Sequence, residues 1–376
     1  MKTAMSFFAI LLCAGIANAT KARNAALGNS FHLRGTQTVF TSPYHVYGLD
    51  NFVALESGLT TATSSNNGTE GSFIMNAGET GKLFMSLGHL DETTQPVRTF
   101  INAVGGSAFK PQQNAVQFIY SHKTDSATFG YGFYYSNFNN KAVGAEEKES
   151  SNGLRVGGSH GSFGWKLNLG LTNTAETTAL KMKGGLYANL GLRYKVDSTN
   201  YAFDFTNWGV KVENVPAGTT AQEHDYQNIV LRAVNVTKVE SNEYFVGAGL
   251  NQTNLKDKIA DKKLTRLHMP VIMGFESKAT DWLMLRGSIT QSILVTNSKD
   301  ERGYPAAAGS VATPANGTVD LEYAGEPNNT SVAVGAGLKF GKLTIDGTLK
   351  DLMSSSGGQK IDGSNLFALV GVVYNY

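Results

Sequence analysis

The sequence predicts an all-β fold, a transmembrane antiparallel up-and-down β-barrel of 14 to 16 strands with short periplasmic turns and long outer loops. Three observations predict it: strands that alternate apolar and polar side chains, short and long connections in turn, and an export signal at the start. The 42 glycines and 20 phenylalanines beside only eight prolines are unusual for a soluble enzyme. They are ordinary for a barrel, where aromatic side chains lie at the boundary of lipid and water.

Residues 1–19 have the layout of a secretory signal peptide. Lys2 precedes an apolar run over residues 7–13, and the small-residue triplet ends at Ala19, after which we predict cleavage. The run is shorter than the roughly 20 apolar residues of a membrane-spanning helix. Cys13 is the only cysteine, so the mature chain has no disulfide and no cysteine metal site. Export through an oxidising compartment suits such a chain.

Charge gives little indication of a partner. Without Lys2 the chain has 31 basic and 30 acidic residues, so it is nearly neutral. We therefore expect no nucleic-acid partner. Since no later stretch reaches the length of a spanning helix, insertion into a membrane must depend on strands with one apolar face.

The strongest strand pattern lies in residues 162–172. Phe163, Trp165 and Leu167 begin an apolar series that alternates with Lys166 and other polar or small residues. Successive side chains of a strand point to opposite faces, so one face is apolar and the other polar. The same alternation is found in residues 128–135, 189–196, 201–206 and 331–340.

The connections distinguish a membrane barrel from a soluble sandwich. We predict tight periplasmic turns at residues 79–81, 123–125, 160–161, 197–199, 240–242, 278–280 and 341. We predict long outer connections at residues 91–113, 139–151, 173–183, 213–225, 255–263, 296–329 and 352–365. Seven hairpins and one strand at each end make sixteen candidates, of which residues 72–75 are the weakest. A further element near residues 319–323 is an alternative, and we find no domain boundary within residues 52–376.

The last strand, residues 366–376, carries a motif. Gly371 is followed three and five residues later by Tyr374 and Tyr376, the terminal residue. This resembles the C-terminal assembly signal of bacterial outer-membrane proteins, although Leu369 stands where a polar residue is usual. The resemblance implies recognition by the barrel-assembly machinery, after which the strand pairs with the first and removes an open edge.

Residues 20–51 carry a second, partial resemblance. Arg23, Leu27-Gly28, residues 38–40 and Ser42-Pro43 precede a strand that begins at Phe52. They look like the opening of the FadL-like barrel family, except that Ser42-Pro43-Tyr44 replaces Asn-Pro-Ala. The resemblance implies a 14-stranded barrel, an N-terminal plug and passage of hydrophobic molecules. A periplasmic lead without a plug is the alternative for residues 20–51.

Chemistry that would indicate an enzyme is mostly absent. The histidines are scattered singly, at positions 32, 45, 89, 122, 160, 224 and 268, without ligand spacing for a metal. His160 and Ser162 share a tight turn, and Asp300 and Glu301 lie in a long connection without a nearby histidine. We therefore predict no enzyme, no metal and no cofactor.

If the aromatic faces contact lipid, basic residues line the interior. The pore-lining candidates are Arg155, Lys166, Arg193, Lys195, Arg232, Arg286, Lys339 and Lys342, with Lys350, against Asp204 and Asp346. A net positive lumen favours anions. Alternatively, these residues pair with acids such as Glu146, Glu147 and Glu149, or form a structural ladder.

Three functions remain open. The first is a porin-like outer-membrane channel for passive diffusion of small polar or anionic solutes. The second is FadL-like transport of hydrophobic molecules, and the third is a structural or surface-contact barrel. A homotrimer is one option, since porins of sixteen strands are commonly trimers and FadL-like barrels are monomers.

Overall fold

The computed structural model describes residues 20–58, 69–105, 109–142, 145–215, 217–218, 220–296, 304–305, 318–319, 330–349 and 369–376. The predicted signal peptide, residues 1–19, lies outside the described residues. So do Asp300, Glu301 and Lys350. In the described ranges, no helix is both long enough and apolar enough to cross a bilayer.

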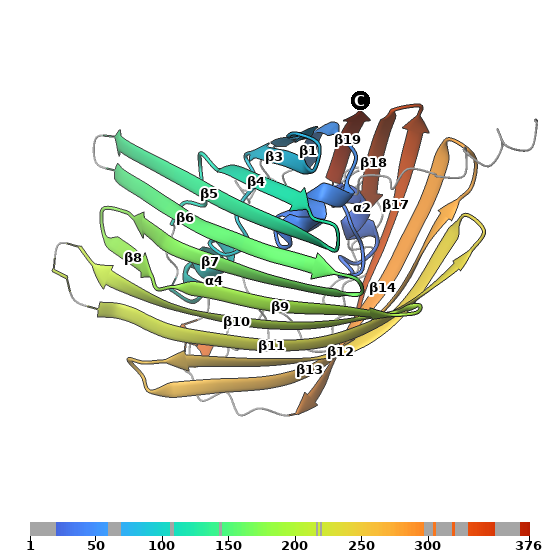
Figure 1. Cartoon of the computed structure of the whole chain (residues 1–376). Coiled ribbons are helices and arrows are strands. Elements are labelled where there is room, and N and C mark those ends of the chain that lie inside the picture. Colours follow the sequence, from blue (N-terminus) through green and yellow to red (C-terminus); the bar gives the residue numbers. More distant parts are fainter. Residues whose placement is uncertain are drawn as a thin grey trace, which may run out of the picture.

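The strands form one closed antiparallel barrel in which the first strand pairs with the last (Figure 1). Short strand β8 and strand β9 share one place between β7 and β10, so the barrel has 16 strand positions. The fold class is confirmed at the upper strand count, and the 14 strands implied by the FadL-like resemblance are wrong. The barrel strands are β1 (Phe52–Gly58), β2 (Glu70–Asn76), β3 (Gly81–Leu87), β4 (Val116–Lys123), β5 (Ala127–Ala142), β6 (Ala145–His160), β7 (Phe163–Glu176), β8 (Leu180–Gly184), β9 (Tyr187–Val196), β10 (Thr199–Asn214), β11 (Thr220–Val239), β12 (Asn242–Asp257), β13 (Lys262–Lys278), β14 (Leu283–Thr296), β17 (Thr330–Phe340), β18 (Leu343–Leu349) and β19 (Leu369–Asn375).

The period-two pattern builds the wall as predicted. On β7, Phe163 and Leu171 are outward and exposed, whereas Lys166 and Asn168 are inward and buried. The same outward exposure of large apolar side chains occurs around the barrel. Examples are Val53, Leu55, Tyr120, Tyr131, Tyr194, Leu231, Leu250, Phe275, Leu285 and Tyr374. An outer wall of this kind matches strands that contact lipid.

The predicted tight turns are all present. Four of them have only two residues between strands, and a residue with positive φ opens each: Gly161, Asp197, Glu240 and Gly341. Such turns fit the right-handed twist of a hairpin. We call this edge of the barrel the turn rim, and because the strand number is even, β1 starts and β19 ends there.

Four of the predicted long connections are mostly strand. β5 and β6 run through residues 139–151, and strands likewise extend into residues 173–183, 213–225 and 255–263. These extensions carry polar side chains outward, for instance Asp225 on β11 and its partner Lys256 on β12, so the apolar alternation fades although the ladder continues. Two other predicted connections, residues 296–329 and 352–365, lie almost wholly outside the described residues. Within the first, β15 (Tyr304–Pro305) pairs with β16 (Thr318–Val319), and residues 320–323 are not described.

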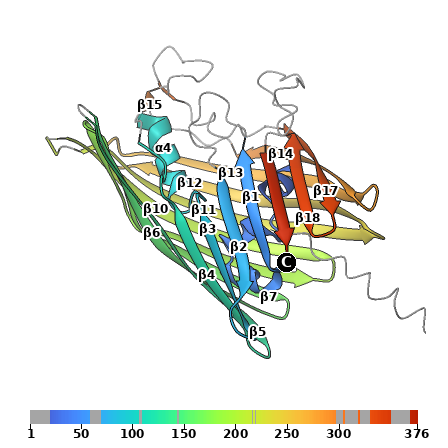
Figure 2. The same cartoon turned by 90° about the horizontal axis from the view of Figure 1, so that it is seen from above.

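Two segments fill part of the lumen. Figures 1 and 2 show the N-terminal segment within the ring of strands, with helices α2 (Lys21–Ala26), α3 (Thr36–Val39) and η2 (Pro43–Gly48). Its apolar side chains, including Phe40 and Val46, pack on inward residues of β1 to β4 and β19. Helix α4 (Gln95–Gly105), within predicted connection 91–113, packs Val97 and Ile101 against inward side chains near the opposite rim. We call that edge the loop rim.

Candidate functional site: a basic cavity in the lumen

The N-terminal segment is tied to the barrel by ionic contacts on several strands. The Thr20 hydroxyl donates to Asp346 on β18 over 2.9 Å, and the Arg23 guanidinium binds both carboxylate oxygens of Glu276 on β13, at 2.7 and 3.0 Å. Gly371 on β19 lies so close that an added Cβ would be 2.5 Å from the Thr20 Cβ. Only glycine permits that approach, which gives Gly371 a packing role beside its predicted place in an assembly signal.

A second set of contacts joins the segment to the first two strands. The Lys21 backbone amide donates to Glu56 on β1 over 2.6 Å, and the Lys21 ammonium pairs with Glu70 on β2. Gln37 also donates to Glu70, over 2.8 Å, and His89 contacts the same carboxylate at 2.8 Å. Both carboxylates are buried, so their partners on the segment offset the cost of desolvation.

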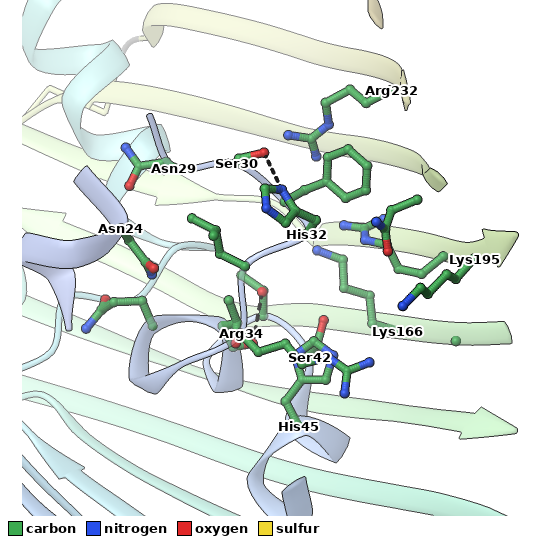
Figure 3. Close-up of a pocket in the computed structure, with 18 of the residues that line it drawn as sticks. Asn24, Asn29, Ser30, His32, Arg34, Ser42, His45, Lys166, Lys195 and Arg232 are labelled. Carbon is green, nitrogen blue, oxygen red and sulfur yellow. Dashed lines mark hydrogen bonds between the residues drawn. The ribbon is translucent and has the colours of Figure 1, made fainter. Parts of the chain in front are cut away.

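Between this segment and strands β6, β7, β9, β10 and β11 lies a cavity of about 680 Å³, which we call the basic cavity (Figure 3). It extends to the turn rim, where Gly161, Ser162 and Asn200 line it. Six cationic side chains and one acidic side chain, Glu92, line it among the described residues. The six are Lys21, Arg34, Lys166, Arg193, Lys195 and Arg232.

Three of these cations share one carboxylate. Asp204 on β10 accepts from Arg232 over 2.7 Å and from Arg193 over 2.9 Å, and the Lys166 ammonium is 3.3 Å away. The two guanidinium groups also lie over the Phe31 ring of the N-terminal segment, at 5.1 and 5.8 Å from its centroid. One negative charge cannot neutralise three positive charges, so this group retains a net positive charge.

Two further cations add positive charge to the basic cavity, and one histidine in its lining is neutral. Arg34 and Lys195 have no ion-pair partner in the described ranges; Arg34 comes from the N-terminal segment and Lys195 from β9 of the barrel wall (Figure 3). Burial, together with the charges of Arg34, Arg193 and Lys166, lowers the pKa of His45 to about 3. His45 is therefore neutral at physiological pH. A neutral imidazole carries one N–H donor and one acceptor.

A second, smaller cavity of about 240 Å³ adjoins the first on the loop-rim side; we call it the amide cavity. The two share Thr41, Glu92, Lys166 and Arg232 as lining residues. Although the Glu92 side chain is exposed to the lumen, the enclosing protein desolvates its carboxyl. This desolvation raises the pKa of Glu92 to about 7, because it outweighs the positive charge of Lys166, which lowers the pKa.

The α4 connection narrows the lumen beyond the amide cavity. Arg98 of α4 pairs with Glu149 on β6 at 2.9 Å, with both side chains almost fully buried. At the start of the connection, Asp91 pairs with Arg155, and the hydroxyls of Thr93 and Tyr134 lie 2.7 Å apart. Breaking a buried pair leaves an uncompensated charge, so these contacts hold the connection against the wall.

The predicted pore-lining residues fall into three groups. Lys166, Arg193, Lys195 and Arg232 line the basic cavity. Arg155 and Arg286 are buried in ion pairs, the latter with Glu276 and Asp346 at 2.5 and 2.6 Å, and Arg155 also lines the amide cavity. Lys339 and Lys342 are exposed near the turn rim and are not among the residues that line either cavity. Their role in conduction stays a prediction.

Among the described residues, Asp204 and Asp346, the inward acids named from the sequence, pair with these cations, whereas the alternative partners Glu146, Glu147 and Glu149 do not. Of Glu146, Glu147 and Glu149, the first two pair with lysines and Glu149 pairs with Arg98. All three lie on β6. The sequence also gave no sign of Arg34, His45 and Glu92 as site residues, because they lie outside the strands and follow no alternation.

Two further features bear on metal and enzyme chemistry. In the described ranges no group of three or more His, Cys, Asp or Glu side chains could hold a metal ion. The His160 ring bonds the carbonyl of Ser126 at 2.8 Å.

No protein-family model matches the chain, and no curated protein matches it. Among solved structures, it is similar to in-vitro folded OmpT, an outer membrane protein of Vibrio cholerae in its trimer form, at 11% identity over 87% of this chain and 98% of that one, with a TM-score of 0.38. It is similar to an anion-selective porin from Comamonas acidovorans at 12% identity over 87% and 97%, with a TM-score of 0.38. It is also similar to the CymD monoaromatic hydrocarbon channel at 9% identity over 96% and 98%, with a TM-score of 0.38. TM-scores this low carry no argument about function, which must be inferred from the residues of this chain.

Proposed function

We propose that this chain is an outer-membrane channel that admits small anionic solutes through a lumen narrowed by its N-terminal segment. The observation that carries the proposal is the basic cavity, where six cationic side chains face one acid in about 680 Å³. Charged side chains around a pore determine which ions pass. The exposed apolar outer wall supports a place in a membrane, with lipid as the barrel's surrounding partner.

The N-terminal segment acts in this proposal as a plug that restricts the route and supplies part of its charge. Lys21 and Arg34, two of the six cations, belong to it. Solutes therefore pass between the plug and the wall of β7, β9 and β11, where Lys166, Arg193 and Arg232 lie. Conductance should accordingly be small for a barrel of this size.

The test is the reversal potential of the refolded protein in a planar bilayer under a potassium chloride gradient. We expect a preference for chloride. The double variant Arg34→Gln/Lys195→Gln, which removes the two cavity cations without an ion-pair partner, should lower that preference. The matched variant Lys123→Gln/Lys141→Gln changes two exposed cations outside both cavities and should leave it unchanged. A cation preference of the unmodified protein contradicts the proposal.

The placement of the N-terminal segment in the lumen also favours the second candidate, FadL-like transport of hydrophobic molecules. The polar and charged lining of both cavities argues against it, because an apolar solute would leave these groups unpaired. Extraction of the purified protein with organic solvent, followed by mass spectrometry, separates the two. A stoichiometric fatty-acid-like ligand together with absent conductance would favour the second candidate.

A further inference from the structure

The amide cavity has a chemistry of its own. One row of neutral side chains crosses four neighbouring strand positions, because Asn168 of β7, Asn189 of β9, Thr206 of β10 and Asn228 of β11 are consecutive cross-strand partners. All four line the amide cavity. We call them the amide row.

The row is held in place by its own hydrogen bonds. The Asn189 amide donates to the Thr206 hydroxyl over 3.0 Å, and the Asn228 amide donates to Thr253 on the next strand over 2.9 Å. Asn168 donates to the carbonyl of Thr41 in the N-terminal segment over 3.0 Å. The row is therefore a preorganised set of amide and hydroxyl groups, which need little rearrangement to bind a solute.

Two buried atoms at this place lack partners among the described residues. The Asn168 Oδ1 atom is an acceptor without a donor, on a side chain that is 3% exposed. The Arg232 Nε atom, in the wall shared by the two cavities, is a donor without an acceptor. Buried polar groups are normally satisfied, so an unsatisfied acceptor and an unsatisfied donor in the lining of one cavity point to a ligand that supplies both complements.

We propose that the two cavities together form a binding site for a hydroxylated acid of small size, such as a sugar acid. Its carboxylate lies among Arg193, Arg232 and Lys166, and its hydroxyl groups bond the amide row toward the loop rim. This inference rests on the proposed function, since it names the class of anion that the channel admits. It goes further in that binding depends on hydroxyl groups as well as on charge.

Neighbouring solute classes fit less well. A hydrophobic acid satisfies the cations but leaves the buried Asn168 Oδ1 atom without a donor, which costs free energy. A neutral polyol satisfies the amide row but leaves the net positive charge around Asp204 without a counter-charge. Only a solute with both features complements both cavities.

The experiment compares three six-carbon solutes as blockers of chloride current through single channels: gluconate, hexanoate and sorbitol. Gluconate should reduce the current at a concentration about tenfold below that of hexanoate, the equivalent of two net hydrogen bonds. Sorbitol should have little effect. Equal block by gluconate and hexanoate, or block by sorbitol as strong as by gluconate, overturns the inference.

Variants locate the two halves of the site. Asn228→Leu and the isosteric Thr206→Val should each weaken block by gluconate about fivefold and leave block by hexanoate unchanged. Arg232→Gln should weaken both. Two row variants are used so that a folding defect in one, detected by circular dichroism, leaves the other as the test. If neither changes the ratio of the two blocking concentrations, the amide row is not the binding surface.

The outcomes also separate this inference from the proposed function. A channel that prefers chloride but does not distinguish gluconate from hexanoate keeps the proposed function and loses the inference. A channel that prefers potassium loses both.

Discussion

Replacing Asp204 by asparagine should strengthen anion binding, because Asp204 is the acid that the cluster of three cations already holds. Its carboxylate lies 2.7 Å from Arg232, 2.9 Å from Arg193 and 3.3 Å from Lys166. An incoming anion competes with it for the same donors. Asparagine keeps the shape of the side chain and removes the charge.

The size of the effect follows from the geometry. An anion on the far side of the Arg232 guanidinium lies about 6 Å from the Asp204 carboxylate, so their repulsion is about 0.7 kcal/mol in bulk water and about 3 kcal/mol at an effective dielectric constant of about 20. A lumen open to solvent and salt is closer to the lower value. We therefore expect an apparent affinity for gluconate about three- to tenfold higher in Asp204→Asn.

The assay is the concentration of gluconate that halves the chloride current of single channels. Arg232→Gln is the matched variant, since it removes a cation from the same ion pair and should weaken block. Circular dichroism in detergent controls for folding. Weaker or unchanged block by gluconate in a correctly folded Asp204→Asn protein would refute the competition between Asp204 and the solute.

Three further predictions concern pH, stability and the plug. The pKa of Glu92 is raised to about 7, so its carboxyl loses its charge as pH falls below 7, and block by gluconate should strengthen on acidification. This pH-dependent increase should vanish in Glu92→Gln. An increase that persists in the variant contradicts the assignment to Glu92. Arg98→Ala leaves Glu149 buried without its cation and should lower the free energy of unfolding in urea by about 3–5 kcal/mol. The control Glu149→Gln/Arg98→Met removes both charges, so no unpaired charge is left buried. Equal stability of the two variants would count against a structural pair. Arg23→Gln and Glu276→Gln each remove the Arg23–Glu276 contact that anchors the N-terminal segment, and each should raise single-channel conductance. Unchanged conductance in both variants would show that this contact does not limit the route of the solute.

The wall of the barrel could be predicted from the sequence because one physical rule governs it. Successive side chains alternate between lipid and lumen, so Lys166, Arg193 and Arg232 could be placed on the inner face from their apolar neighbours. The rule weakens beyond the apolar band, where both faces of a strand are polar. Residues 139–151 were therefore predicted as a connection although β5 and β6 run through them.

The site itself could be predicted only in part. Which inward cations retain net positive charge depends on partners far away in sequence, such as Asp91 for Arg155, and no local pattern reports such a pair. Arg34, His45 and Glu92 belong to segments without strand periodicity, so nothing marked them as facing the lumen. Asp204 could be recognised as inward, but its position among three cations depends on the register of β7, β9, β10 and β11.

The contacts of Thr20 and Lys21 also bear on the order of assembly. Thr20 holds Asp346 of β18 and packs on Gly371 of β19, while the next residue holds Glu56 of β1. Two consecutive residues of the plug thus bridge the line along which the barrel closes. These contacts need β18, β19 and β1 in place together, so they form only as the ring closes, and they stabilise the closed ring over an open one.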